Sequence, residues 1–434
     1  MQLADTSEKP DSSSRLSPLK YIESRWIGRK FGRNFWVFFT AAFLFDFGFA
    51  LYFFLFNLFL ANLHYKENIL GLVTGALTMG NVAGSIPVSM LSRRFGLQRV
   101  LLLGFIASPI ICVLRTFILW MPAQIGLAFL SGAALSTWTV CFSPTVARLT
   151  TEENRVSAFS IVFATGIGSG TLAGLVGGYL PVLLKARVEA SQLVDNMRLV
   201  LLLACGIVML AIVPVLKLRL GPAEGTKKRQ FQLLHPFLLR FLPPFALWSI
   251  VTGSFPPFAA VYLQQRLRIP LTNVGIIFSA AQLAQFGAVL LAPFLFRRFG
   301  TIIGIMCTQV ATGVAVFALG RTQNISLAIL FYLGFASLQF MSGPGIYSLL
   351  MNQIPDEQRS AASAVQNMVG ALSHSGVAVL SGFMLVKYGY PKVLAGNAVI
   401  AVAAALLLFS MLGSIDRRLT SPVPVPRRAS PHLK

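Results

Sequence analysis

The sequence predicts an all-α integral membrane protein in which twelve transmembrane helices form two pseudo-symmetric six-helix bundles. Three observations carry this prediction. The chain is 55% hydrophobic and only 12% charged, whereas soluble domains average about 25% charged residues. Apolar runs long enough to cross a bilayer, which takes roughly 20 residues, recur from one end to the other. Finally, the two halves repeat each other. A β-barrel would instead show short alternating segments.

The apolar runs divide the 434 residues into twelve predicted spans. These lie near 35–62, 69–90, 100–120, 124–145, 157–184, 196–217, 241–264, 272–295, 301–320, 325–348, 361–386 and 391–412. They give five regions: an N-terminal tail (1–34), a first bundle (35–217), a charged central linker (218–240), a second bundle (241–412) and a C-terminal tail (413–434). The opening residues are polar, with no cleavable signal peptide, so we expect the first span to anchor the chain.

The net charge of +22 indicates orientation rather than nucleic-acid binding. With the N-terminus in the cytoplasm, most of the 36 lysines and arginines fall on the cytoplasmic side, as the positive-inside rule requires. We therefore expect a multi-pass protein of the cell membrane with both termini cytoplasmic. The minimal loops favour a prokaryotic inner membrane.

The tetrapeptide RRFG occurs at Arg93–Gly96 and again at Arg297–Gly300, an offset of 204 residues (from Arg93 to Arg297). The same offset, without a gap, aligns further residues at helix ends and loops. The aligned pairs include Glu153 with Glu357, Arg155 with Arg359, Gly166 with Gly370, and Gly178 with Gly382. Parallel repeats of six spans are typical of transporter folds that bind their ligand between the halves.

The loop after the second span resembles a motif of the major facilitator superfamily, G-x-x-x-D-R-x-G-R-R. Arg94 and Gly96 match its Arg-x-Gly core and Arg99 corresponds to its last Arg, one position later, whereas Arg93 occupies the acidic position, as Arg297 does in the second copy. The resemblance extends over about 35–412 and implies that fold, a monomer and alternating access. It also implies that the first, fourth, seventh and tenth spans line a central cavity. The charge relay through the family's Asp does not carry over.

The cytoplasmic loops offer a candidate gate. Glu153 and Glu357 could pair with the arginines of the RRFG turns, Arg93, Arg94, Arg297 and Arg298. Such pairs would favour the outward-open state when closed. The alternative is that these arginines only fix the topology.

Two ionisable residues lie in the middle of predicted spans, Asp46 in the first and His374 in the eleventh. Ionisable groups at membrane depth cost about 2.5–3.5 kcal/mol on insertion scales, so each indicates a function. We interpret them as a proton-coupling pair. Alternatively, Asp46 caps a neighbouring helix and His374 bridges two helices by a hydrogen bond.

Small residues recur every four positions in the fifth and eleventh spans, which allows close helix packing. They are Gly166, Gly170, Gly174, Gly177, Gly178, Gly370 and Gly382. The fifth span partly resembles the family's exporter motif, G-x-x-x-G-P-x-x-G-G, but its Gly-Pro pair is Ala173-Gly174. Many drug-exporting relatives carry an Arg four residues before a Gly in the fourth span, and here that position is Ala128.

Amides and aromatics in otherwise apolar spans suit an amphipathic organic ligand. The cavity candidates are Asn57, Trp138, Gln264, Gln282, Gln285, Gln339, Tyr347 and Asn367. For most of them, hydrogen bonding between helices is an equal alternative. Arg115 and Arg266 lie near span ends, so we expect no fixed positive charge deep in the cavity. Pro256, Pro257 and Pro344 are candidate bend points.

These patterns predict a secondary transporter that moves a small organic molecule, with proton-coupled efflux as the leading hypothesis. An uptake carrier or uncoupled facilitator of the same fold is one alternative, and a receptor or scaffold without transport is another. We find no Walker loop and no enzyme or metal motif, so we expect no enzyme activity, cofactor or metal. The four cysteines, one in each of four spans, are expected to be small core residues.

Overall fold

The computed structural model describes residues 31–185, 193–218, 220 and 236–420. The side chains of a few helical residues, Glu153 and Glu357 among them, lie outside the described set. Every regular element in the described ranges is a helix. Twelve helical segments are long and apolar enough to cross a membrane, which confirms the predicted number of spans.

The helices follow the predicted spans closely. In the first half they are α2 (Arg33–Asn62), α3 (Glu67–Phe95), α4 (Leu97–Phe117), α5 (Met121–Arg148), α6 (Glu152–Lys185), α7 (Leu193–Leu210) and α8 (Ile212–Lys217). In the second half they are α9 (Pro236–Ser254), α10 (Pro256–Val261), the π-helix Tyr262–Arg266, α11 (Leu271–Phe299), α12 (Thr301–Arg321), α13 (Ile325–Met341), α14 (Gly343–Gln353), α15 (Asp356–Tyr388) and α16 (Tyr390–Thr420). Of the predicted central linker, 236–240 are helical.

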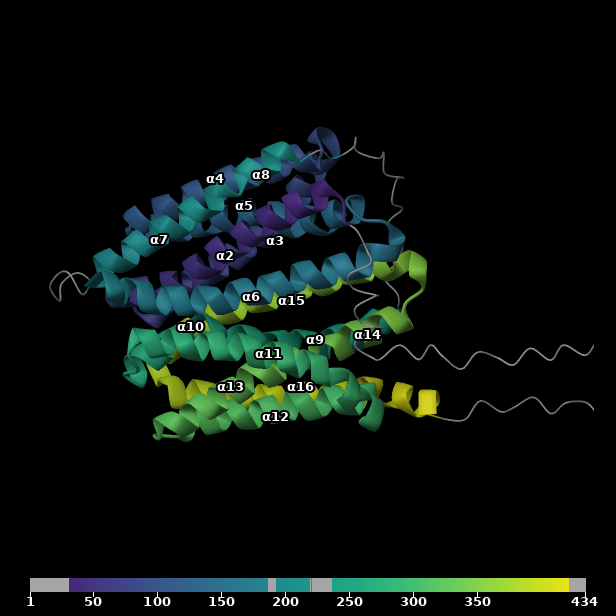
Figure 1. Cartoon of the computed structure of the whole chain (residues 1–434). Helices are drawn as coiled ribbons and strands as arrows, with labels where there is room; N and C mark the ends of the chain where they lie inside the picture. Colours follow the sequence, from purple (N-terminus) through teal and green to yellow (C-terminus); the bar gives the residue numbers. More distant parts are fainter. Residues whose placement is uncertain (1–30, 186–192, 219, 221–235, 421–434) are drawn as a thin grey trace, which may run out of the picture.

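The two halves lie side by side (Figure 1). Helices α4, α5, α7 and α8 form one outer side and α12, α13 and α16 the other, with α6, α11 and α15 between them. Across the junction α3 packs against α15 and α6 packs against α11. We call the end of the molecule that carries Arg93 and Arg297 the arginine end.

The RRFG turns have the same backbone in both halves. Gly96 and Gly300 each have φ 86°, with ψ of 156° and 161°. This region of backbone conformation is open essentially to glycine alone. Each glycine N–H donates back to its own helix, to the carbonyl oxygen of Ser92 or Phe296. The repeated tetrapeptide therefore ends one helix and starts the next by the same sharp turn.

Two spans are interrupted at the predicted proline positions, which confirms the bend points. The seventh span breaks between α9 and α10 at Phe255, directly before Pro256 and Pro257. The tenth breaks between α13 and α14 at Ser342, two residues before Pro344. A proline lacks the N–H that would continue the helical ladder, so each break frees backbone groups in the middle of a span.

Hydrogen bonds join the halves at the end opposite the arginine end. They run from Asn57 Nδ2 to Pro257 O (2.9 Å), Asn62 Nδ2 to Gln264 Oε1 (3.0 Å), Gln265 Nε2 to Ala61 O (3.0 Å), Ser279 Oγ to Thr171 O (2.6 Å) and Ser375 Oγ to Gly75 O (2.8 Å). Glycines allow this approach, since a Cβ on Gly178 would lie 2.9 Å from Gly275 Cα. The junction is therefore tightly packed at this end.

The remaining glycines of the two small-residue stripes face different neighbours. Gly170 and Gly174 lie against Gln282 and Ser279 of α11, whereas Gly177 faces Phe54 of α2. Gly166 faces Asp46, Gly370 faces Phe245 of α9, and Gly382 lies against the backbone of Glu67. The stripes thus serve packing both within and between halves. Three cysteines are buried, but Cys307 is exposed on α12, so the core prediction was wrong for that residue.

Candidate functional site

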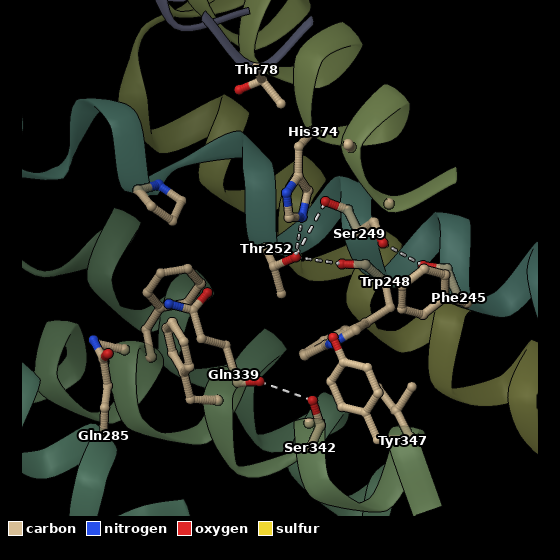
Figure 2. A pocket seen from close by; sticks show the side chains of 18 of the residues that line it. Thr78, Phe245, Trp248, Ser249, Thr252, Gln285, Gln339, Ser342, Tyr347 and His374 are labelled. Carbon is tan, nitrogen blue, oxygen red and sulfur yellow. Dashed lines mark hydrogen bonds between the residues drawn. The ribbon is translucent and has the colours of Figure 1, made fainter. Parts of the chain in front are cut away.

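The first cavity is enclosed mainly by α9, α11, α13, α14 and α15 and has a volume of about 630 Å³. Figure 2 shows its polar groups converging from these helices. The polar residues that line this cavity include Ser249, Thr252, Gln282, Gln285, Gln339, Ser342, Tyr347, Gln366, Asn367 and His374. Aromatic side chains, including Phe245, Trp248 and Tyr332, complete the wall. Tyr347, on the part of α14 that runs toward the arginine end, is 54% exposed.

A second cavity of about 450 Å³ lies between the two halves. Its wall is formed largely by α2, α3 and α10, with Asn57 and a group of phenylalanines. Thr78, Thr252, Gln282 and His374 line both cavities. We therefore treat the two as one central cavity, with a wide part in the second half and a deep part between the halves. The deep part reaches the hydrogen-bonded end of the junction.

His374 lies where the two parts of the central cavity meet. Its Nε2 is 2.9 Å from the hydroxyl oxygen of Thr252, on α9 (Figure 2). Gly253, the next residue, leaves room for the imidazole, because a Cβ there would lie 2.8 Å from His374 Cδ2. The arrangement holds one ring nitrogen to a neighbouring helix while the ring stays on the cavity wall.

Two glutamines of the wide part carry unsatisfied side-chain oxygens. Gln366 is 1% and Gln339 8% exposed, and neither Oε1 has a hydrogen-bond partner among the described residues. A buried carbonyl oxygen without a donor is costly. Two side chains on the wall of the wide part therefore hold acceptor atoms that lack a donor in this conformation.

Asp46 lies in the first half, outside the residues that line either part of the cavity. The half-buried side chain accepts a hydrogen bond from Trp138 of α5 and faces Gly166 of α6. Asp46 lies one helical turn before Ala50, which lines the deep part. Asp46 and His374 are thus on opposite sides of the junction and do not form a direct pair.

The structure separates the eight predicted cavity residues into three groups. Gln282, Gln285, Gln339, Tyr347 and Asn367 line the wide part, and Asn57 and Gln282 line the deep part. Trp138 and Gln264 line neither. The Trp138 ring packs 4.7 Å from the ring of Phe45, and Gln264 joins the two halves through Asn62. Sequence reasoning missed Gln366, Thr252 and Trp248.

Arg115 requires a correction. It does lie in the last turn of α4, but its side chain is 1% exposed and lines the deep part of the cavity. The expectation that no fixed positive charge lies deep in the cavity was therefore wrong. The reason is that the arginine faces the interior of the bundle, where its guanidinium carbon lies 4.2 Å from the centre of the Phe56 ring.

The arginines of the RRFG turns are exposed, as is Arg99. Arg94 lies 5.3 Å from the ring centre of Phe95. The predicted acidic partners cannot be placed, because the side chains of Glu153 and Glu357 fall outside the described set. Arg359 donates from Nε to the carbonyl oxygens of Met351 (2.9 Å) and Ile354 (3.2 Å), which caps the end of α14. Arg155 lies in the first turn of α6, where its backbone N–H donates to the carbonyl oxygen of Thr151 at 3.0 Å.

The twelve-helix fold, its two repeated halves and the cavity between them define a class of membrane carrier. The family model of the Major Facilitator Superfamily matches residues 38–378. The chain belongs to the Major Facilitator Superfamily. This family consists of membrane transporters and not of enzymes.

One curated relative and two solved structures extend this comparison. The chain is 24% identical over 226 residues to an uncharacterized MFS-type transporter, YvqJ, of Bacillus subtilis (strain 168). That match spans 49% of this chain and half the length of the relative. A D-xylose-proton symporter matches with a TM-score of 0.72 and 16% identity, covering 87% of this chain and 97% of that one. The nucleoside transporter NupG matches with a TM-score of 0.72 and 14% identity, covering 88% of this chain and 99% of that one. Both similarities are evidence for the fold alone.

Proposed function

We propose that this protein is a proton-coupled secondary transporter that exports a small organic molecule by alternating access. The observation that carries the proposal is the central cavity, which combines convergent amides and hydroxyls with an aromatic wall. Such a mixture suits an organic ligand of moderate size that is held by a few directed hydrogen bonds. The transporter acts as a monomer within the bilayer.

Packing at one end of the junction supports alternating access. The halves meet through glycine contacts and single hydrogen bonds between side chains and backbone, such as Ser375 to Gly75. Contacts of this kind can be exchanged for contacts at the other end when the halves rock about the cavity. The broken helices at Phe255 and Ser342 supply bending points on the cavity wall.

Asp46 is proposed to carry the proton. Within the described part of the chain, no cation forms an ion pair with this carboxyl, whose polar partner is Trp138. A carboxyl inside a span is rare and marks a proton or ligand pathway once water can reach it. Movement of α2 against α6, which carries Gly166 opposite Asp46, would admit that water. His374 is proposed to respond to the ligand on the cavity wall.

Export is proposed from the partial exporter pattern of α6, which ends in Gly177 and Gly178. The absent Gly-Pro pair favours the second candidate, uptake by symport or facilitated diffusion. Antiport and symport would use the same cavity and differ in the direction in which the compound moves relative to the proton. A receptor or scaffold role would give ligand binding without flux.

Proteoliposomes with an internal pH indicator test the proposal. A panel of lipophilic drugs, hydrophobic cations, sugars and organic acids is added to the wild type, D46N and the matched control D195N. Asp195 forms an exposed ion pair with Arg198 at 3.1 Å, so its loss should leave flux unchanged. We expect a compound that moves protons in the wild type and D195N, with coupling lost in D46N. Normal coupling in D46N would exclude Asp46 as the proton carrier. Compound flux without proton flux would favour the facilitator.

A further inference from the structure

Arg115 is a buried cation on the wall of the deep part of the central cavity. The third helix of each half carries an arginine in its last turn, Arg115 in α4 and Arg321 in α12. Arg321 is exposed, as expected for a residue at the edge of a span, whereas Arg115 is 1% exposed. The position in the helix therefore does not account for the burial of Arg115.

The guanidinium of Arg115 has the thiol of Cys112 beside it and, among the described residues, no carboxylate that would compensate its charge. Its Nε and Nη1 are buried, without a hydrogen-bond acceptor in the part of the chain that the structure describes. Across the same residues, no carboxylate forms an ion pair with it. A buried, unpaired charge is strongly destabilising, and the usual solution is a partner of opposite charge.

The aromatic contact of Arg115 orients the guanidinium without neutralising it. The Phe56 ring, which also lines the deep part, lies 4.2 Å from the guanidinium carbon. A ring at this distance interacts with one face of the planar group. The Nε and Nη1 hydrogens are left for an acceptor, and a guanidinium binds a carboxylate through hydrogens of this kind.

The backbone around Arg115 is held in place. Gln124 of α5 donates from Nε2 to the carbonyl oxygens of Arg115 and Ile118, which ties the end of α4 to the next helix. The hydroxyl of Tyr52 donates to the carbonyl oxygen of Cys112 at 3.0 Å, one turn before Arg115. The cation is therefore presented from a fixed helix end, as a binding residue requires.

We propose that Arg115 is the anion-binding group of the central cavity and that the transported compound is an organic acid with one carboxylate. The carboxylate binds the guanidinium edge in the deep part, beside the phenylalanines of α2. The body of the molecule extends past His374 into the wide part, where Gln339 and Gln366 accept its hydrogen bonds. This assignment rests on the proposed transport function and names the class of its substrate.

Matched probes test the assignment on the full-length protein in detergent. Each probe is a pair of an aryl carboxylate and its primary amide: phenylacetate with phenylacetamide, and 1-naphthylacetate with 1-naphthylacetamide. Sodium chloride serves as the small-anion control. Binding is followed by quenching of tryptophan fluorescence, since Trp248 lines the wide part, and by thermal shift. The variants are R115Q, R115K and the matched exposed control R321Q.

The expected result is that the wild type binds a carboxylate at least about tenfold more tightly than its amide. R321Q keeps this preference and R115Q loses it. R115K, which retains the charge but not the two-pronged edge, keeps a weaker preference. If R115Q does not fold, the carboxylate preference of R115K tests the proposal in its place. The proposal is overturned if no pair is distinguished by the wild type, if R115Q keeps the preference, or if chloride alone reproduces the effect.

The two proposals fail separately. Proton-coupled flux of an uncharged compound, with no Arg115-dependent carboxylate binding, would leave the transport function standing and overturn the organic-acid assignment. Arg115-dependent carboxylate binding without flux of any compound would retain the anion site and overturn transport.

Discussion

The hydroxyl of Ser375 in α15 donates a 2.8 Å hydrogen bond to the carbonyl oxygen of Gly75 in α3, and this bond joins the two halves of the protein. Ser375 follows His374, so the same turn of α15 forms both the cavity wall and the junction. A Cβ on Gly75 would lie 2.6 Å from Val379 Cγ2 and 2.9 Å from the carbonyl oxygen of Ser375. The approach of the two helices therefore depends on glycine. The junction contact and the cavity wall therefore share a single helical turn.

Gly75→Ala should weaken the packed end of the junction. The added methyl group cannot be accommodated without separating α3 from α15, at a cost of about 1–3 kcal/mol to this conformation. We expect faster labelling of a cysteine placed at Thr74, on the wall of the deep part, by a membrane-impermeant maleimide added to intact cells. Gly126→Ala is the control, since a Cβ there meets nothing within 4 Å. Equal labelling in the two variants would mean that this contact does not close the cavity.

The RRFG turns should be intolerant of any side chain at their glycine. Gly96→Ala and Gly300→Ala each force a non-glycine residue to φ near 86° with extended ψ. The expected loss is about 1–3 kcal/mol each. Thermal unfolding in detergent measures it, with Gly206→Ala as the helical control that meets no neighbour. A similar unfolding temperature for all three variants would contradict the role of the turn.

The spans and their interruptions could be predicted because they depend on local sequence. Length and hydropathy determine where a helix crosses the bilayer. The breaks at Phe255 and Ser342 lie just before prolines, which lack the N–H that would continue the helix. The repeat of RRFG likewise reflects a backbone conformation that is available essentially to glycine. These features required no knowledge of which helices meet.

The site was predicted only partly, because helices in a membrane are often apolar around their whole circumference. Such helices have no polar stripe that tells which face is buried. Arg115 was therefore placed at a span end without its inward direction, and Trp138 was assigned to the cavity although it packs among phenylalanines. Gln282 and Gln339 were identified because an amide in an apolar helix is rare enough to be informative by itself.

His374 and Thr252 should contribute to ligand binding together, as one hydrogen-bonded pair. Thr252→Val keeps the shape but removes the hydroxyl, and His374→Gln changes its partner. Each variant should lower affinity for a transported compound about five- to tenfold, equivalent to about 1–1.4 kcal/mol. The double variant should be no worse than the single ones, because both remove the same interaction. Affinities come from ligand titrations of all three variants.

Thr308→Val provides the control for this cycle. Its hydroxyl bonds only within α12, to the carbonyl oxygen of Ile305 at 2.7 Å, and Thr308 is not among the residues that line the cavity. It should leave affinity unchanged. Fully additive losses in Thr252→Val and His374→Gln would show that the two side chains act on the ligand independently.

We expect Gln366 to contribute to ligand binding while lowering the free energy of unfolding. Its buried Oε1 has no donor among the described residues, so Gln366→Leu removes an unsatisfied group while keeping a similar volume. We expect the free energy of unfolding to rise by about 1 kcal/mol and ligand affinity to fall about five- to tenfold. Gln124→Leu should instead lower the free energy of unfolding, because the Gln124 amide donates to two backbone carbonyl oxygens at the end of α4. Thermal unfolding and ligand titration on the two variants separate these effects. Lower stability in Gln366→Leu would mean that Gln366 holds the helices together, and the wide part of the cavity would then lose its proposed acceptor.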